Sequence, residues 1–293
     1  MSDSRTNEPI QKAEEKDVSY IINELGEDRD LYFGAVAPPI IQTSNFAFKK
    51  IADIKKAFDD EFDDYLYSRG LNPTTDILRK KLAALDGAED CLVFNSGASA
   101  IFASVFSNVK AGDHIVSVNK PYSWAQKLFD FTLPRFGVNT TYVDGRDIKN
   151  FEAAVTPATK IIYLESPNSW DYQMQDLPAV AALAKSKGII TIIDNSYATP
   201  LHMRPIELGI DLVLQSATKY IGGHSDVVAG VLTGTHAMMK QIFNNELMSM
   251  GNAISPQNAW LLIRGLRTLP ARLERISATT VKVLGYLKTH SQV

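Results

Sequence analysis

Polar residues that could do chemistry stand directly after three short apolar runs. Asp194 follows the run 189–193, and Lys219 comes shortly after the run 212–214. The third run, 92–94, leads into a Ser-Gly-Ala segment that could open a helix. The full set is Asp194, then Lys219 with Ser216 and Thr218, then Ser96, Gly97 and Ala98. Together they supply a carboxylate, an amine, hydroxyls and a helix N-terminus.

These groups suit an aldehyde cofactor that carries a phosphate. A lysine amine can form a Schiff base with an aldehyde, and a carboxylate facing a pyridine nitrogen keeps that nitrogen protonated. A helix N-terminus with nearby hydroxyls can hold a phosphate. Each signal alone has an ordinary reading, because strand-end aspartates are often caps, single lysines are often solvated, and Ser-Gly-Ala is often only a tight turn. The combination is what favours a cofactor site.

The expected elements would bring these residues together. Short apolar runs alternate with helical patterns, which indicates a mainly parallel sheet covered on both faces. One helix is expected to open at Pro73 and close at Gly87, and another to span 177–187 with Gly188 as its cap. In such sheets ligands bind at the carboxyl ends of the strands. The chemistry-bearing segments therefore share one edge of the predicted sheet.

Composition excludes several classes of function. Lys and Arg total 30 against 33 acidic residues, a net charge of −3, which leaves no basic footprint for nucleic acid or for a membrane surface. Cys91 is the single cysteine, so no intrachain disulfide can form and a reducing compartment fits best. Residues 1–17 lack the apolar stretch of a signal peptide, and no run approaches the roughly 18 apolar residues of a spanning helix. A cytoplasmic protein is expected.

The chain is expected to divide into three segments. Residues 1–64 read as an irregular N-terminal arm that packs on a neighbouring subunit, because the segment shows no pattern able to bury itself. Residues 65–258 are expected to form the large, cofactor-binding domain. Residues 259–293 read as the start of a C-terminal domain that is apparently truncated.

Several motifs resemble the Cys/Met-metabolism family of enzymes that depend on pyridoxal 5'-phosphate (PLP). Ser216-Ala217-Thr218-Lys219-Tyr220, followed by 223–226, is similar to the family's cofactor-lysine segment. Further matches, in the family's order, are Tyr67-Ser68-Arg69, Asn72-Pro73-Thr74, 94–97, 112–115 and Asp194-Asn195. The resemblance implies the PLP-dependent transferase-like fold type I. This is an α/β/α sandwich with a mainly parallel sheet, an N-terminal arm and, here, an incomplete C-terminal domain.

The same resemblance implies roles for single residues. Lys219 resembles the lysine that binds PLP and moves protons once the substrate displaces it, and Asp194 resembles the partner of the pyridine nitrogen. Tyr122 is similar to the tyrosine that stacks on the cofactor ring, although by itself it would read as a surface aromatic. Tyr67 and Arg69, otherwise a local surface cluster, resemble a pair that reaches the phosphate of the neighbouring subunit, where a guanidinium is well suited. The remaining cofactor contacts are expected from Ser96, Gly97, Ala98, Ser216 and Thr218.

Two departures from the family pattern leave the subgroup open. Ser169-Trp170 replaces a frequent Asn-Pro pair and resembles the bacterial β-lyase type, whereas 67–74 looks more like the γ-type members. The chain also ends before the domain that in this family brings the arginine for the substrate α-carboxylate. Arg264 and Arg267 look instead like helix-surface residues. His224 and Asp226 are expected to be structural, and the other histidines show no metal-ligand spacing.

The expected function is that of a PLP-dependent C–S lyase or trans-sulfuration enzyme acting on sulfur amino acids, most like cystathionine β-lyase. The alternatives within the family are cystathionine γ-synthase, a γ-lyase and an O-acylhomoserine sulfhydrylase. An alternative of another class is an inactive cofactor-binding or structural subunit, because the C-terminal domain is incomplete. The arm implies a homo-oligomer, at least a dimer and expected to be a dimer of dimers. The partner molecule would be a small amino-acid substrate, cystathionine or a related compound.

Overall fold

A seven-stranded sheet organises the described part of the chain. The computed structural model describes residues 17–293, and the expectation about a signal peptide therefore falls almost entirely outside the described residues. The strands are β1 (Asp90–Phe94), β2 (His114–Val118), β3 (Asn139–Val143), β4 (Thr159–Glu165), β5 (Ile190–Asp194), β6 (Leu212–Gln215) and β7 (Gly230–Gly234). Their order in the sheet is β1-β7-β6-β5-β4-β2-β3. Only the pairs that involve β7 are antiparallel, so the predicted mainly parallel sheet is confirmed.

The strands β3 and β7 carry weaker sequence signals than the others. β3 lies at the edge of the sheet, and its residues alternate between exposed and partly buried positions, so it has no continuous apolar run. β7 begins and ends with glycine and contains Thr233. The predicted strand 189–193 lies one residue further along, which makes Asp194 the last residue of β5.

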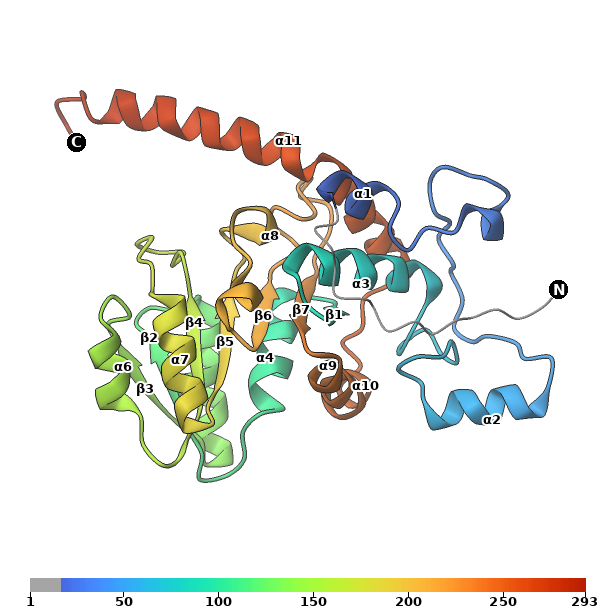
Figure 1. The fold of residues 1–293 in the computed structure, drawn as a ribbon, viewed down its shortest axis with the longest axis horizontal. Helices are drawn as coiled ribbons and strands as arrows, with labels where there is room; N and C mark the ends of the chain where they lie inside the picture. The colour runs from blue at the N-terminus through green and yellow to red at the C-terminus, as the bar shows by residue number, and fades with distance from the viewer. Residues whose placement is uncertain (1–16) are drawn as a thin grey trace.

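Helices cover both faces of the sheet, which gives the predicted α/β/α sandwich (Figure 1). Alternate residues of β4 divide between the faces, with Ile161 and Tyr163 in one apolar cluster and Ile162 and Leu164 in another. The first cluster contains α4 (Gly97–Phe106), α5 (Ser123–Lys127) and α9 (His236–Ile242). The second contains α6 (Ile148–Ala154) and α7 (Leu177–Lys187), while α3 (Pro73–Asp86) packs over β1 and β7.

The predicted helix ends have the expected capping geometry. Asn72 caps α3 by accepting a hydrogen bond from the backbone N–H of Thr74, as short polar side chains do at helix starts. Gly87 and Gly188 end α3 and α7 with φ of 70° and 65°, in the left-handed region that glycine adopts without strain.

The described part of the N-terminal arm, residues 17–64, is less irregular than expected. It contains α1 (Val18–Asn23) and α2 (Ile51–Asp59), and Ile21 and Ile22 are buried in an apolar cluster with α3 and α11. The Lys81 ammonium, fully buried, lies 3.0 Å from a carboxylate oxygen of Glu27. This part of the arm therefore has a core position within its own chain. Its packing on a neighbouring subunit remains a prediction.

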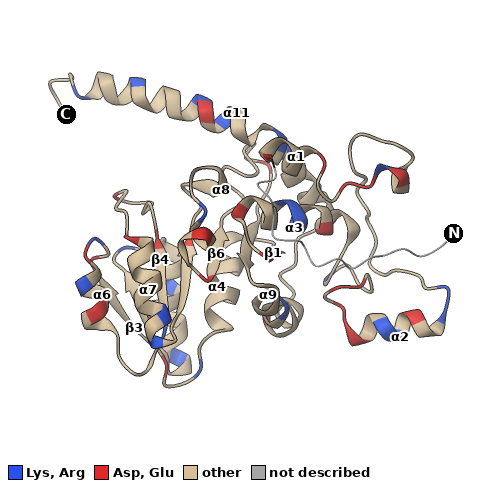
Figure 2. Cartoon of the chain, in the orientation of Figure 1, with Lys and Arg blue, Asp and Glu red and all other residues tan. Residues whose placement is uncertain are grey.

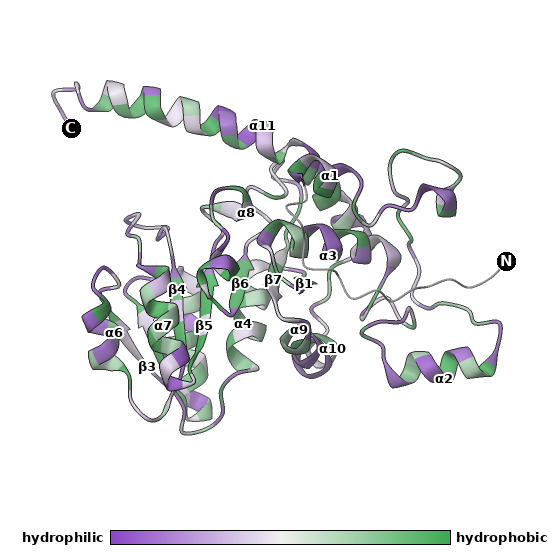
Figure 3. Ribbon diagram, in the orientation of Figure 1, coloured by the Kyte–Doolittle hydropathy of each residue, from purple (hydrophilic) through white to green (hydrophobic). Residues whose placement is uncertain are grey.

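The C-terminal segment is one long helix, α11 (Pro256–Leu287). Its first half packs against α3 and α1, and its second half extends from the body with apolar side chains on its surface (Figures 1 and 3). Arg264 is exposed on α11 and Arg267 is half-buried, and they form ion pairs with Asp226 and Glu27. Charges of both signs are interspersed over the ribbon (Figure 2). Within residues 17–293, no helix is long and apolar enough to cross a membrane.

Candidate active site

The carboxyl ends of the parallel strands gather the predicted residues on one edge of the sheet. Glu165 at the end of β4 pairs in register with Asp194 on β5, and Asp194 pairs with Leu214 on β6. The chain then leaves β6 through Ser216 and turns at Lys219. The sheet therefore places the carboxylate and the lysine turn on adjacent strand ends.

Asp194 is a buried carboxylate that forms no ion pair within the described residues. Its side chain is part of a residue only 7% exposed, and its Oδ1 accepts a hydrogen bond of 2.9 Å from the Ser196 N–H. Burial, and then the negative charge of Glu165, raise the pKa of Asp194 to about 7. A positively charged group bound next to Asp194 would offset both effects. The position therefore favours the binding of a cation.

Lys219 lies in a turn that its backbone fixes. Its N–H donates to the Ser216 carbonyl at 3.0 Å, and its own carbonyl accepts from the Gly223 N–H at 2.8 Å. The side chain is exposed and forms no ion pair with any residue of the described chain. The amine is therefore available for a reaction at the carboxyl edge of the sheet.

The N-terminus of α4 lies against the lysine turn. Ser96 caps α4, and its Oγ accepts from the Ser99 N–H at 3.1 Å, which leaves the first N–H groups of the helix without helical partners. A Cβ added at Gly97 would stand 3.1 Å from the Ser216 Cβ, and one at Gly230 would stand 2.2 Å from the Ser96 carbonyl oxygen. The start of β7 thus approaches the loop after β1 so closely that glycine is required at 230, and a Cβ at Gly97 would make a tight contact with the loop after β6.

The residues with hydroxyl groups near this helix end differ in the hydrogen bonds that they already make. The Thr218 Oγ1 accepts from the Ala229 N–H at 3.0 Å and donates to the Ala229 carbonyl at 3.2 Å. Ser216 uses its backbone N–H, which donates to the Ser196 Oγ at 2.6 Å. The predicted phosphate contacts of Ser216 and Thr218 remain predictions, and Thr218 would have to give up a bond to make one.

Glu165 and Ser196 are residues that the sequence reasoning did not select. Glu165 is 4% exposed, and its Oε2 accepts from the Tyr122 backbone N–H at 2.6 Å, so it fixes the start of the Tyr122 turn. Ser196 joins the exits of β5 and β6. The strand-end rule that identified Asp194 also applies to Glu165, which follows the apolar run 161–164.

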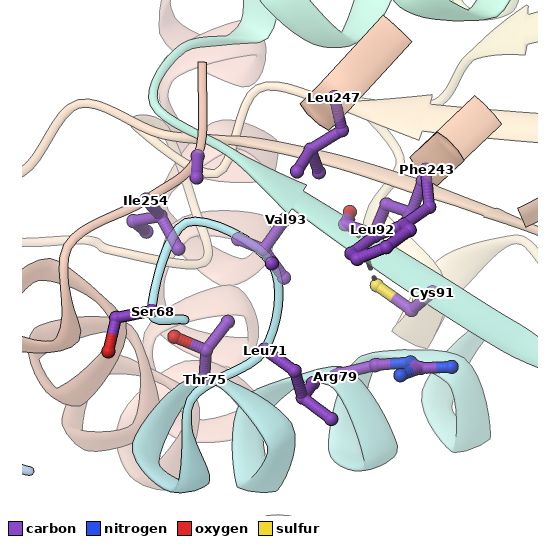
Figure 4. Close-up of a pocket in the computed structure, with 12 residues that line it drawn as sticks. Ser68, Leu71, Thr75, Arg79, Cys91, Leu92, Val93, Phe243, Leu247 and Ile254 are labelled. Atoms are coloured by element: carbon purple, nitrogen blue, oxygen red, sulfur yellow. Dashed lines mark hydrogen bonds between the residues drawn. The ribbon is translucent and has the colours of Figure 1, made fainter. Parts of the chain in front are cut away.

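Tyr67 and Arg69 face outward from their own chain. Both are exposed, and the Arg69 guanidinium lies 5.3 Å from the centre of the Tyr67 ring. The loop between them and α3 is held against β1, where it borders a cavity of about 20 Å³ lined in part by Ser68, Leu71 and Val93 (Figure 4). Their predicted contact with a neighbour's phosphate remains a prediction.

His224 makes a contact within its own turn, and Asp226 pairs with a residue of α11. The His224 Nδ1 is 2.7 Å from the Gly222 carbonyl, and Asp226 pairs with Arg264 at 3.2 Å. Within residues 17–293 no group of three His, Cys, Asp or Glu residues is arranged to hold a metal ion.

The donor set fits PLP. Asp194 offers a buried carboxylate without a cation, which matches a protonated pyridine nitrogen. The N-terminus of α4 can hold a phosphate, Gly97 and Gly230 let the loops around it pack closely, and Lys219 supplies the amine. Tyr122 stands at the same edge with a partly exposed ring.

Comparison with known proteins agrees with this fit. The family model for Cys/Met metabolism PLP-dependent enzymes matches residues 20–293. An L-methionine γ-lyase of Treponema denticola is 40% identical over 89% of this chain and 66% of its own length. A cystathionine β-lyase of Lactococcus lactis is 37% identical over 92% of this chain and 68% of its own length. The chain thus spans about two thirds of the length of these curated relatives.

A solved structure extends the comparison. A putative O-acetylhomoserine (thiol)-lyase of Campylobacter jejuni, which contains a pyridoxyl-lysine, superimposes with a TM-score of 0.89 at 26% identity, over 94% of this chain and 76% of that chain. Fold, site geometry and sequence agree: the chain belongs to the Cys/Met metabolism family of PLP-dependent enzymes.

Proposed function

We propose that this protein is a PLP-dependent carbon–sulfur lyase that acts on a sulfur amino acid. The observation that carries the proposal is Asp194, a buried carboxylate without an ion-pair partner among residues 17–293, on the strand next to the lysine turn. The methionine γ-lyase and cystathionine β-lyase among its relatives support the same chemistry.

The roles of the residues follow from their positions. PLP, when bound, supplies an electron sink for the carbanion formed at the substrate α-carbon. Asp194 would hold the proton on the ring nitrogen, and the α4 N-terminus with Ser96 would hold the phosphate. The Lys219 Nζ would bind the cofactor and then take the α-proton of the substrate. Tyr122 would stack on the ring from the turn that Glu165 holds.

We propose β-elimination, as in cystathionine β-lyase, as the first candidate reaction, because Ser169-Trp170 stands where many relatives have Asn-Pro. A γ-elimination is the second candidate, since L-methionine γ-lyases are among the relatives, with up to 40% identity. Product analysis separates the two. From cystathionine, β-elimination releases homocysteine, pyruvate and ammonia, whereas γ-elimination releases cysteine, 2-oxobutyrate and ammonia.

The same assay tests the alternative of another class. Turnover of cystathionine or methionine by the 293-residue chain, lost in Lys219→Ala, supports an enzyme. Cofactor binding without turnover of either compound would favour an inactive cofactor-binding or structural subunit.

We further propose a homo-oligomer, a dimer of dimers, in which Tyr67 and Arg69 reach the cofactor phosphate of the neighbouring subunit. Their outward orientation supports this proposal. We also propose a cytoplasmic location, on the reasoning that a single cysteine suits a reducing compartment.

A further inference from the structure

We propose that Glu165 is a positioning residue that clasps the Tyr122 turn to the cofactor edge of the sheet. This inference rests on the proposed function, because it assigns Glu165 a role in holding Tyr122 for the bound cofactor. Glu165 itself would touch neither cofactor nor substrate.

The two carboxylate oxygens of Glu165 bind two different loops. Oε2 accepts from the Tyr122 N–H at 2.6 Å, and Oε1 accepts from the Ser169 N–H at 2.7 Å. Tyr122 belongs to the loop after β2, and Ser169 to the loop after β4. Charge-assisted bonds of this kind are shorter and stronger than neutral ones, and the residue is only 4% exposed, so water competes little for either amide.

A second contact fastens the same two loops. The Asn168 side chain, 2% exposed, donates from Nδ2 to the Lys120 carbonyl at 3.0 Å. Lys120 has φ of 52°, a left-handed conformation that costs energy in a non-glycine residue and persists where surrounding contacts hold it. Glu165 and Asn168 therefore form hydrogen bonds to the backbone on both sides of Pro121. These bonds fix the backbone from which the Tyr122 side chain extends.

The position of Glu165 relates the Tyr122 turn to Asp194. Glu165 and Asp194 are register partners on adjacent strands. One buried strand end thus holds the turn that carries the ring-stacking tyrosine beside the carboxylate that faces the ring nitrogen. This arrangement explains why a second carboxylate is buried next to Asp194 despite their mutual repulsion.

The test uses Glu165→Gln, which is nearly isosteric but offers one acceptor oxygen and presents an amino group to the other amide. We expect the Kd for PLP to rise about tenfold, as befits loss of a charge-assisted bond to a buried N–H. We also expect the visible circular dichroism of the bound cofactor to weaken, because that signal depends on a fixed aromatic environment. Glu152→Gln, an exposed carboxylate on α6, is the matched control and should change neither quantity.

A double-mutant cycle with Tyr122→Ala separates positioning from a general loss of stability. If Glu165 acts through Tyr122, then Glu165→Gln should change the Kd less than twofold in the Tyr122→Ala background. A full tenfold effect in that background, or a wild-type Kd and dichroism in Glu165→Gln alone, would overturn the proposal. Should Glu165→Gln not fold, Glu165→Asp serves the same cycle, since its shorter side chain cannot reach both amides.

Failure of the proposed function would look different. In that case the wild-type protein would itself bind no PLP, or would bind it without turning over cystathionine or methionine. A wild type that binds PLP with a variant that binds it equally well contradicts only the role of Glu165.

Discussion

Replacing Asp194 by asparagine should remove the pH dependence of stability that this buried carboxylate gives to the cofactor-free protein. The folded-state pKa of Asp194 is raised from 3.8 to about 7. A group with a raised carboxyl pKa binds more protons in the folded than in the unfolded state between these values. Its penalty on stability is therefore absent below about pH 4, grows as the pH rises, and is fully present above about pH 7.

The magnitude follows from the same two values. A rise in pKa from 3.8 to about 7 corresponds to roughly 4 kcal/mol of stability lost by pH 8, of which about 2–3 kcal/mol is lost between pH 5 and pH 8. Asparagine cannot ionise, and its Oδ1 can keep the 2.9 Å hydrogen bond from the Ser196 N–H. Asp194→Asn should therefore be more stable than wild type, by an amount that increases with pH over this range.

Urea unfolding of the cofactor-free proteins at pH 5 and pH 8 measures this difference directly. Asp53→Asn, which removes an exposed carboxylate on α2, is the matched control. Adding PLP should reverse the order, because only the carboxylate can pair with the ring nitrogen, and turnover should fall about 10²–10³-fold in the variant. Equal pH dependence of stability in wild type and Asp194→Asn would refute the reasoning, since the carboxylate would then titrate alike in the folded and unfolded states.

Three further perturbations test the rest of the site. Borohydride should fix the cofactor to Lys219 in the wild type and leave no adduct in Lys219→Ala, and peptide mapping that finds the adduct on another lysine would contradict the assignment. Mixing inactive Arg69→Ala with inactive Lys219→Ala subunits should restore about a quarter of wild-type activity if each site uses two chains. The reason is that about half of randomly formed dimers are hybrids, and each hybrid has one intact site out of two. Verified hybrids without activity would place Arg69 outside the neighbouring subunit's site. Gly230→Ala should either unfold the protein or weaken PLP binding about tenfold or more, because its Cβ would meet the Ser96 carbonyl at 2.2 Å. Near-normal PLP affinity and melting temperature would contradict this, because they would show that the Ser96 loop can move to accept the Cβ.

The sequence by itself determined the class of fold and the main chemistry-bearing positions. Strands of a sheet that is covered on both faces are continuous runs of apolar residues. The strands β4, β5 and β6 could therefore be located from such runs in the sequence alone. Polar residues at the ends of such strands must share an edge, which is why Asp194 and Lys219 could be proposed together. Helix ends could also be predicted from the sequence, because Asn72 and Gly87 cap the helix through contacts with residues only a few positions away.

Only the tertiary structure decided the contacts that link distant segments. The bond from the Tyr122 N–H to Glu165 spans 43 residues, and no local pattern reveals which of several strand-end carboxylates will receive it. The burial of Ile21 and Ile22 against α3 and α11 likewise depends on packing, so a segment without a core pattern of its own gained a core position. The pKa of Asp194 also belongs to this class, because it depends on removal of water and on Glu165 across the strand pair, and these exist only once the sheet has formed.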